Sequence, residues 1–140
     1  MPLRSLAAAL VLIASCAGHA AAQDKGYPAV PLLSTGTTII GEPLRYPATG
    51  AAHVTAAIVT LAPGEQTIVH KHGVPLFAYI LEGELTVDYG EHGKRTYLAG
   101  QAFMEAMATA HFGSNSGSRP ARLLAVYMGG EGAEDVVVDK

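Results

Sequence analysis

A length of 140 residues is typical of one domain, and 49% of the residues are apolar, which is enough for one hydrophobic core. The formal charge of −3, with no basic stripe and no long run of like charge, excludes nucleic acid as an expected partner and provides no polybasic membrane anchor. We therefore expect one domain with one functional site.

Residues 1–22 have the pattern of a signal peptide. Arg4 is followed by a short apolar run over residues 5–15, and Ala20 and Ala22 form an A-x-A cleavage site. The run is shorter than the roughly 20 residues that a membrane-spanning helix needs. The pattern predicts a soluble periplasmic or secreted protein that does not enter the membrane.

A lipoprotein is the alternative to soluble export. Residues 13–16 resemble a bacterial lipobox, in which Cys16 would be lipidated and would become the mature N-terminus. If cleavage instead follows Ala22, no cysteine remains, so the exported domain depends on its core or on a metal for stability.

The mature chain begins with an arm over residues 23–40, and a single domain follows over residues 41–140. Gly26, Pro28 and Pro31 give the arm an extended, irregular character. Nine short β-rich runs are predicted from there on: 37–40, 54–61, 67–72, 76–81, 85–89, 95–98, 102–105, 111–114 and 122–127.

Turn signals rich in glycine, proline and asparagine separate these runs, which predicts an antiparallel sandwich or barrel. The only stretch that resembles a helix is the short Ala-rich segment 104–110. We therefore expect an all-β fold. Four aromatic residues are candidates for its core or for the lining of a cavity: Phe77, Tyr79, Phe103 and Phe112.

Two of the six histidines, His70 and His72, have the spacing of metal ligands. Residues i and i+2 of a strand point to the same face, so the two imidazoles would project side by side. Neutral imidazole suits zinc, copper, iron and nickel. A pair of surface histidines is the alternative, and His19, His53 and His92 have no such partner.

The surroundings of this pair resemble the first motif of the cupin superfamily. Gly64, His70, His72 and Gly83 fall on the motif, whereas Leu76 stands where the family has a glutamate. The glycines are expected at turns where a positive φ is needed.

The second cupin motif is matched further along the chain. Gly100, His111 and Asn115 fall on it, while Ala106 replaces its proline and Ala108 its glycine. Ordinary turn chemistry is a sufficient role for the glycines and for Asn115.

The resemblance implies an all-β, double-stranded β-helix (jelly-roll) cupin barrel. It also implies that His70, His72 and His111 hold one divalent metal ion, with Fe, Mn, Zn, Ni and Cu all possible. Single-domain cupins often form homodimers by exchanging an N-terminal strand, which is the role expected here for residues 23–40.

The missing glutamate affects the charge of such a site. A divalent ion on three neutral imidazoles keeps its full charge and attracts an anion in a low-dielectric cavity. Three protein ligands leave coordination positions open, as in catalytic sites. We therefore expect a small anionic or chelating ligand.

The three-histidine arrangement is similar to that of acetylacetone dioxygenase and cysteine dioxygenase, which are iron(II) cupins. Glu105 stands six residues before His111, near the place of an outer-shell glutamate in the former. Its carboxylate is expected to bond a ligand imidazole, to act as a fourth ligand, or to act as a general base. A solvent-facing carboxylate is the alternative.

These features favour an oxidative, dioxygenase-like enzyme with Glu105 as its catalytic residue. A cupin that binds a metal or small ligand without turnover is the second hypothesis. The third is a metal-independent cupin isomerase or a metal-free structural cupin, in which the histidines act as acid and base or have lost their role. Oxygen uptake that depends on the metal and on the three histidines would distinguish the first from the others.

Overall fold

The computed structural model describes residues 28–138. The predicted signal peptide, Cys16 and the first residues of the arm lie outside this range, so their assignment stays a prediction. Over the described range, no helix has the length and apolar character that crossing a membrane requires.

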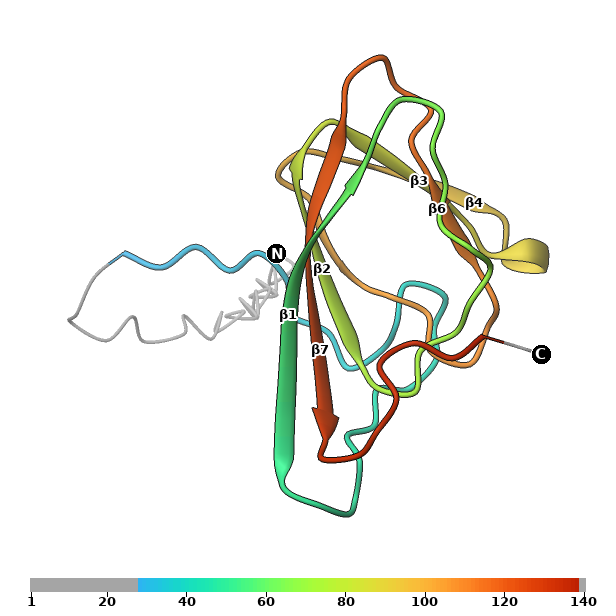
Figure 1. Cartoon of the computed structure of the whole chain (residues 1–140). Helices are drawn as coiled ribbons and strands as arrows, with labels where there is room; N and C mark the ends of the chain where they lie inside the picture. Colours follow the sequence, from blue (N-terminus) through green and yellow to red (C-terminus); the bar gives the residue numbers. More distant parts are fainter. Residues whose placement is uncertain (1–27, 139–140) are drawn as a thin grey trace, which may run out of the picture.

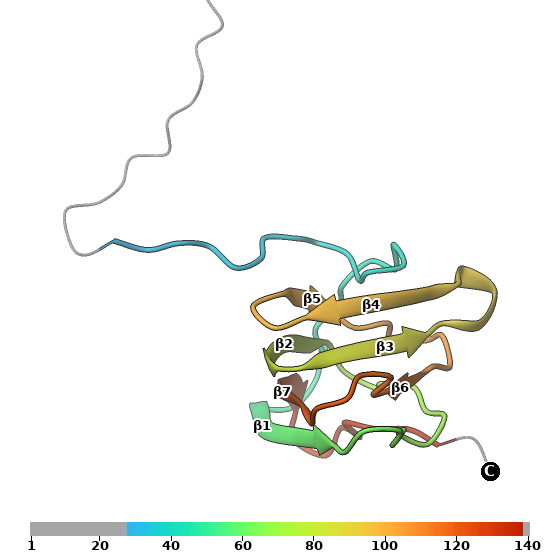
Figure 2. The same cartoon turned by 90° about the horizontal axis from the view of Figure 1, so that it is seen from above.

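Seven antiparallel strands form two sheets that face each other (Figures 1 and 2). The four-stranded sheet has the order β1-β7-β2-β5, with bounds β1 Ala52–Leu61, β7 Ala121–Gly130, β2 Leu76–Glu82 and β5 Ala102–Met104. The three-stranded sheet has the order β4-β3-β6, with bounds β4 Lys94–Leu98, β3 Glu84–Asp88 and β6 Phe112–Ser114.

Alternating side chains explain why the two sheets close on each other. In β2, Leu76, Ala78 and Ile80 are buried while the residues between them are partly exposed, as expected for a strand with one face on a core. The rings of Tyr97 on β4 and Phe103 on β5 stack with centroids 3.7 Å apart, which joins the two sheets at one edge. The prediction of an all-β antiparallel fold is confirmed.

Two of the nine predicted strands do not form. Thr37 makes only an isolated bridge to Pro43, and the run 67–72 is held by isolated bridges at His70 and Lys71. Thr37 bridges to Pro43, which has no N–H to continue a ladder. The bridges Gln66–Ser114 and His70–His111 differ in register by one residue, so the pairing of the run 67–72 with the segment before and within β6 is interrupted. The hairpin turn around His92 closes with a short 3-10 helix, η1 (Gly90–His92).

The turn residues predicted from the motifs lie in turns. Gly64, Gly83 and Gly100 have φ of 81°, 72° and 90°, a region that glycine enters without a steric penalty. The Asn115 side chain accepts a hydrogen bond from Gly117 N and donates to the carbonyls of Leu61 and Arg119. These residues therefore fix turns between strands of the barrel.

The N-terminal arm reaches away from the barrel in both views (Figures 1 and 2). Val30 is 84% exposed and Leu32 58% exposed. The chain joins the barrel at Ile39, whose N–H donates to the carbonyl of Met104 at the end of β5. The outer part of the arm thus exposes apolar side chains, while Leu33 and Thr35 lie beside Met104 of β5.

Candidate metal centre

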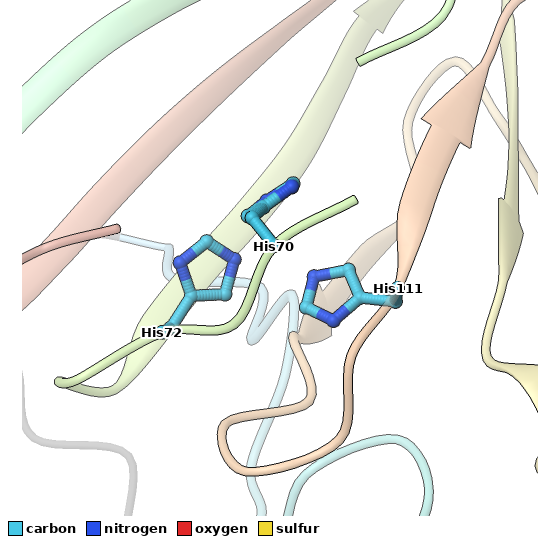
Figure 3. A group of neighbouring side chains, drawn as sticks. All are labelled: His70, His72 and His111. Carbon is cyan, nitrogen blue, oxygen red and sulfur yellow. The ribbon is translucent and has the colours of Figure 1, made fainter. Parts of the chain in front are cut away.

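His70, His72 and His111 lie side by side (Figure 3). His70 and His72 come from the segment between β1 and β2, and His111 directly precedes β6. The backbones of His70 and His111 bond each other in both directions, at 3.0 and 2.9 Å. One ligand nitrogen from each histidine lies within 4.8 Å of the others, so the sequence prediction of one cluster is met.

Backbone carbonyls hold the Nδ1 atom of each ring. His70 Nδ1 lies 2.8 Å from the carbonyl of Ile68, His72 Nδ1 lies 3.0 Å from that of Asp135, and His111 Nδ1 lies 2.8 Å from that of Thr109. A carbonyl can only accept, so each Nδ1 carries the proton and each Nε2 keeps a free lone pair. All three rings are set in the tautomer that binds a metal through Nε2.

The surroundings of two of the Nε2 atoms fit a bound metal. The Nε2 atoms of His72 and His111 are buried without a hydrogen-bond partner, and the residues themselves are 5% and 2% exposed. Buried polar atoms are normally bonded, so two converging exceptions need an explanation. A divalent ion shared with His70 would satisfy both, and the donor set therefore fits a metal.

Burial keeps the imidazoles in the neutral form that binds a metal. Desolvation lowers the pKa of His72 to about 4, and it also lowers the pKa values of His70 and His111. Because a metal ligand has to be deprotonated, these shifts reduce the competition from protons.

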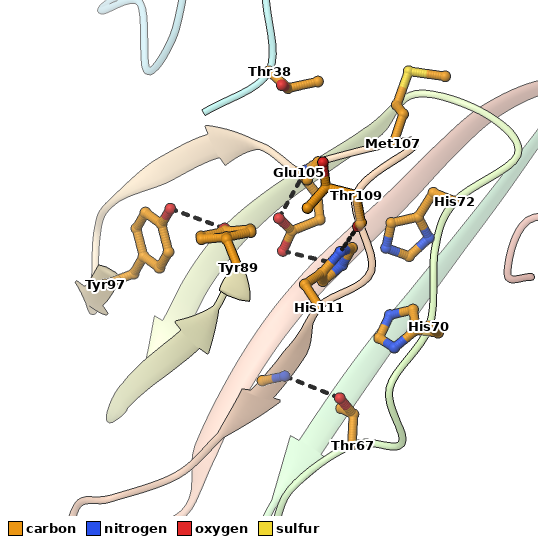
Figure 4. A network of polar contacts seen from close by, with 12 residues as sticks. Thr38, Thr67, His70, His72, Tyr89, Tyr97, Glu105, Met107, Thr109 and His111 are labelled. Carbon is orange, nitrogen blue, oxygen red and sulfur yellow. Dashed lines mark hydrogen bonds and ion pairs between the residues drawn. The ribbon is translucent and has the colours of Figure 1, made fainter. Parts of the chain in front are cut away.

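Glu105 is buried beside the three rings, 5% exposed, rather than facing solvent (Figure 4). Its Oε2 lies 3.9 Å from His111 Nε2, on the side of the ligand nitrogen, while its Oε1 accepts the N–H of Ala106 at 2.8 Å. Because Thr109 already holds His111 Nδ1, the expected bond from Glu105 to the outer nitrogen of a ligand ring does not form. The fourth-ligand and general-base roles remain.

Two tyrosine side chains with neighbouring hydroxyl groups lie near Glu105 (Figure 4). The hydroxyls of Tyr89 and Tyr97 lie 3.1 Å apart, and Tyr89 lies between Tyr97 and Glu105 (Figure 4). Burial raises the pKa of Glu105 to about 7, and the neighbouring Tyr89 hydroxyl and the Ala106 N–H oppose that rise. In the metal-free protein this carboxyl group is therefore only partly ionised near neutral pH.

The histidines and Glu105 line a cavity of about 80 Å³ inside the barrel. Its walls are mostly aliphatic and come from both sheets, with Tyr127 and Leu76 near the histidines. Phe77, Tyr79, Phe103 and Phe112 do not line it, and no lysine or arginine does. Leu76 thus occupies the wall position at which the first motif has a glutamate.

His53 and His92 are not brought to this centre. Neither belongs to a group of metal-binding residues within the described part of the chain, and both are exposed. Two contributors were missed from sequence, namely the Asp135 carbonyl and the Glu42 side chain. A main-chain acceptor has no residue-type signature, and Glu42 has no motif around it.

Comparisons with known proteins agree with this architecture. The family model described as a cupin domain matches residues 57–127. An RmlC-like cupin family protein with a double-stranded β-helix fold from Methanocaldococcus jannaschii aligns with a TM-score of 0.52 at 20% identity, over 57% of this chain and 73% of that chain. This likeness confirms the predicted jelly-roll fold.

Two further solved structures are similar at lower TM-scores. A mutant of Bacillus subtilis oxalate decarboxylase is 27% identical, with 61% of this chain and 24% of that chain covered and a TM-score of 0.49. A sugar phosphate isomerase from a cupin superfamily from Silicibacter pomeroyi is 24% identical, with 54% and 50% covered and a TM-score of 0.47. The match thus spans about a quarter of the decarboxylase chain. No curated protein matches.

Proposed function

Because this chain belongs to the cupin domain family, and because three histidines and a buried carboxylate converge in its barrel, we propose that it is a metal-dependent oxidative enzyme. The substrate would be a small chelating anion, and the reaction would be dioxygenase-like. We also propose that the enzyme works after export. The observation that carries the proposal is the pair of buried, unpartnered Nε2 atoms that face the cavity beside Glu105.

His70, His72 and His111 would hold the metal through Nε2. A bound divalent ion would supply open positions for a chelating anion and, if redox-active, a route for electrons to O₂. The three Nδ1–H groups stay bonded to their carbonyls, so the rings keep their orientation during turnover. The aliphatic walls exclude water from the reacting atoms.

The cavity restricts the class of substrate. Among the described residues its lining contains no lysine or arginine, so a negative charge on the ligand that is not bound to the metal would have no cationic partner. A volume of about 80 Å³ limits the ligand to a small molecule. These properties favour a monoanionic bidentate group with a small apolar remainder, such as the enolate of a β-diketone or a short hydroxy acid.

Glu105 is the proposed catalytic residue. Its Oε2 faces the ligand side of His111, while Oε1 is fixed by Ala106 N–H. A carboxylate in this place can accept the proton that an enolisable substrate loses on binding, which Tyr89 and Tyr97 would support through their hydroxyls. The fourth-ligand role is the alternative for the same group.

Oxygen uptake tests the proposal. The protein would be stripped of metal, reloaded separately with Fe(II), Mn(II), Zn(II), Ni(II) and Cu(II), and assayed with acetylacetone, small thiols and short hydroxy acids. We expect uptake with Fe(II) or Mn(II), none in a His70→Ala, His72→Ala variant, and a fall of about 10²-fold or more in Glu105→Gln. His53→Ala is the matched control.

The outcome separates the hypotheses. Tight metal and ligand binding without turnover on any substrate class would overturn the enzyme in favour of a binding cupin. Conversion of a sugar or keto substrate without oxygen uptake would favour an isomerase. No metal binding at all would overturn the metal centre itself.

We also propose that the chain forms a homodimer through its arm. Residues 28–36 extend away from their own barrel and expose Val30 and Leu32 (Figures 1 and 2). A second copy would cover this apolar surface, whereas a monomer leaves it in water. Light scattering of the mature protein and of a variant lacking residues 28–34 would test the proposal, with a dimer expected only for the former.

A further inference from the structure

The loop from Glu105 to Ala110 carries the candidate acid and ends directly before His111. It has neither strand nor helix structure, and it contains no proline that would restrict its backbone. A loop of this kind loses considerable conformational entropy when it is ordered. Its geometry must therefore be held by hydrogen bonds to other segments of the chain.

Glu42, two residues after the N-terminal arm, supplies most of those bonds. Its Oε2 accepts from Met107 N at 2.7 Å and from the Thr38 hydroxyl at 3.1 Å. Its Oε1 accepts from Ala108 N at 3.1 Å and from the N–H and hydroxyl of Thr109 at 3.1 and 3.2 Å. Hydrogen bonds to a carboxylate are stronger than those between neutral groups.

The same loop residues hold two of the three histidines. The carbonyl of Met107 accepts the backbone N–H of His72 at 3.0 Å, and the carbonyl of Thr109 holds His111 Nδ1 at 2.8 Å. The peptide unit between Met107 and Ala108 is thus bonded on both sides, to His72 through its oxygen and to Glu42 through its N–H. One carboxylate connects to two ligand residues, each time through one residue of the loop.

Glu42 is itself fixed, and it does not reach the cavity. Its backbone N–H donates to the Thr38 hydroxyl at 3.1 Å, and its carbonyl accepts from Thr38 N at 2.8 Å. Thr38 is 4% exposed and lies near Met107 (Figure 4). Glu42 is not among the residues that line the cavity, so it does not touch a ligand there.

We propose that Glu42 is a positioning residue of the metal centre, which orders the 105–110 loop and thereby sets the backbone of His72 and the ring of His111. The inference rests on the proposed metal centre and not on the proposed oxidation. It requires that loss of the Glu42 carboxylate weakens metal binding even when the barrel stays folded.

Cobalt(II) titration of the metal-free full chain tests this role. Visible absorption of bound Co(II) reports both affinity and coordination geometry. Glu42→Gln keeps the size of the side chain but turns one acceptor into a donor that faces backbone N–H groups. We expect affinity about 10-fold lower, at the small end of the 10–100-fold range for outer residues of metal sites, together with altered absorption bands.

Glu65→Gln is the matched control, because the Glu65 carboxylate also accepts a backbone N–H, from Ala62, but lies in an exposed turn. Thr109→Val removes only the hydroxyl donor and is expected to weaken Co(II) binding about 2–3-fold, within the range for one hydrogen bond. This milder variant keeps the test valid if Glu42→Gln does not fold.

Each outcome decides one question. Lower affinity and altered bands in Glu42→Gln and a smaller effect in Thr109→Val, with Glu65→Gln unchanged, would support the role. Unchanged affinity and bands in the Glu42 and Thr109 variants would overturn it, even if Glu42→Gln lowered the stability. No Co(II) binding by the unmodified protein would overturn the metal centre and this inference together, whereas absence of oxygen uptake would affect only the proposed reaction.

Discussion

The wall of the barrel and its metal centre are built in different ways. In the wall, β1 and β7 pair over ten consecutive residues, from Ala52 opposite Gly130 to Leu61 opposite Ala121. At the metal centre, His70 and Lys71 are held by isolated bridges, and the loop before His111 has no regular structure. The wall is held by a repeating ladder and the metal centre by single contacts.

The difference shows where stability and function reside. A wall residue can be replaced by one of similar size at little cost in stability, because many equivalent contacts contribute to the free energy of folding. The ring of each ligand residue depends on one specific carbonyl acceptor, which is two residues away for His70 and His111 and lies on the distant C-terminal segment, at Asp135, for His72. We therefore expect changes in the wall to alter the free energy of unfolding, and changes at the metal centre to alter metal binding.

Loss of a ligand is the largest expected effect. His111→Ala removes a buried Nε2 and should weaken metal binding by more than about 100-fold, beyond the effect of any outer residue. Metal content after dialysis, measured by elemental analysis, checks it. His53→Ala, on the exposed start of β1, should keep the metal. Full metal content in His111→Ala would contradict the site.

A change in the wall should give the opposite pattern. Ile80→Ala empties part of the core, where Ile80 is 1% exposed, and should lower the free energy of unfolding by about 2–5 kcal/mol. Metal stoichiometry should stay at the level of the unmodified protein, because Ile80 does not line the cavity. Denaturant unfolding and metal analysis of the same sample check both parts. Loss of metal from the folded variant would show that the two regions are coupled.

The pH dependence of stability sharpens the comparison for the metal-free protein. The pKa of His72 is lowered to about 4 in the folded state, so the unfolded chain binds more protons between about pH 4 and 6.5, and stability rises with pH. The pKa of Glu105 is raised to about 7, so its contribution is present below about pH 4.5 and is lost as pH rises through 7.

Glu105→Gln removes the second of these opposing effects. The variant should gain stability more steeply than the unmodified protein between pH 4.5 and 7, by up to about 3 kcal/mol at neutral pH. Unfolding by denaturant at several pH values, with a chelator present, measures this difference. Glu65→Gln, in an exposed turn, is the control. Parallel curves for Glu105→Gln and the unmodified protein would contradict a buried, protonated Glu105 in the metal-free state.

A smaller effect is expected where the C-terminal segment crosses the histidine segment. A Cβ on Gly73 would overlap the backbone oxygen of Glu134, so Gly73→Ala should displace the segment that holds His72 Nδ1. We expect a loss of about 1–3 kcal/mol and weaker metal binding. Gly36→Ala, where a Cβ meets nothing within 4 Å, is the control. Thermal unfolding and Co(II) titration distinguish the two variants.

The wall could be predicted from sequence because its pattern is local. Alternating residues such as Leu76, Ala78 and Ile80 indicate a strand with one buried face, and Gly83 and Gly100 mark its turns. The cluster of three histidines could also be predicted, since the fixed spacing of two motifs places His70, His72 and His111 on one barrel. The prediction of regular strands at 37–40 and 67–72 was wrong, because strand propensity does not show where the register of pairing shifts or where a proline partner interrupts the ladder.

The surroundings of the histidines could not be predicted in the same way. The acceptors that set the ring tautomers are main-chain carbonyls of Ile68, Thr109 and Asp135, and every residue carries such a group. The burial of Glu105 and the hydrogen bonds that Glu42 accepts depend on tertiary structure, because Glu42 and the loop residues it binds are 65 or more positions apart in the sequence. Only the tertiary structure brings these groups within bonding distance.

The carbonyl of Asp135 has a consequence for the order of events during synthesis. A nascent chain ending before residue 135 would contain all three histidines and Glu105, yet His72 would have no acceptor for its Nδ1–H. Contacts of such long sequence separation form late in folding, because chain closure costs entropy before they repay it. High-affinity metal capture would therefore begin only after the segment around Asp135 has joined the fold.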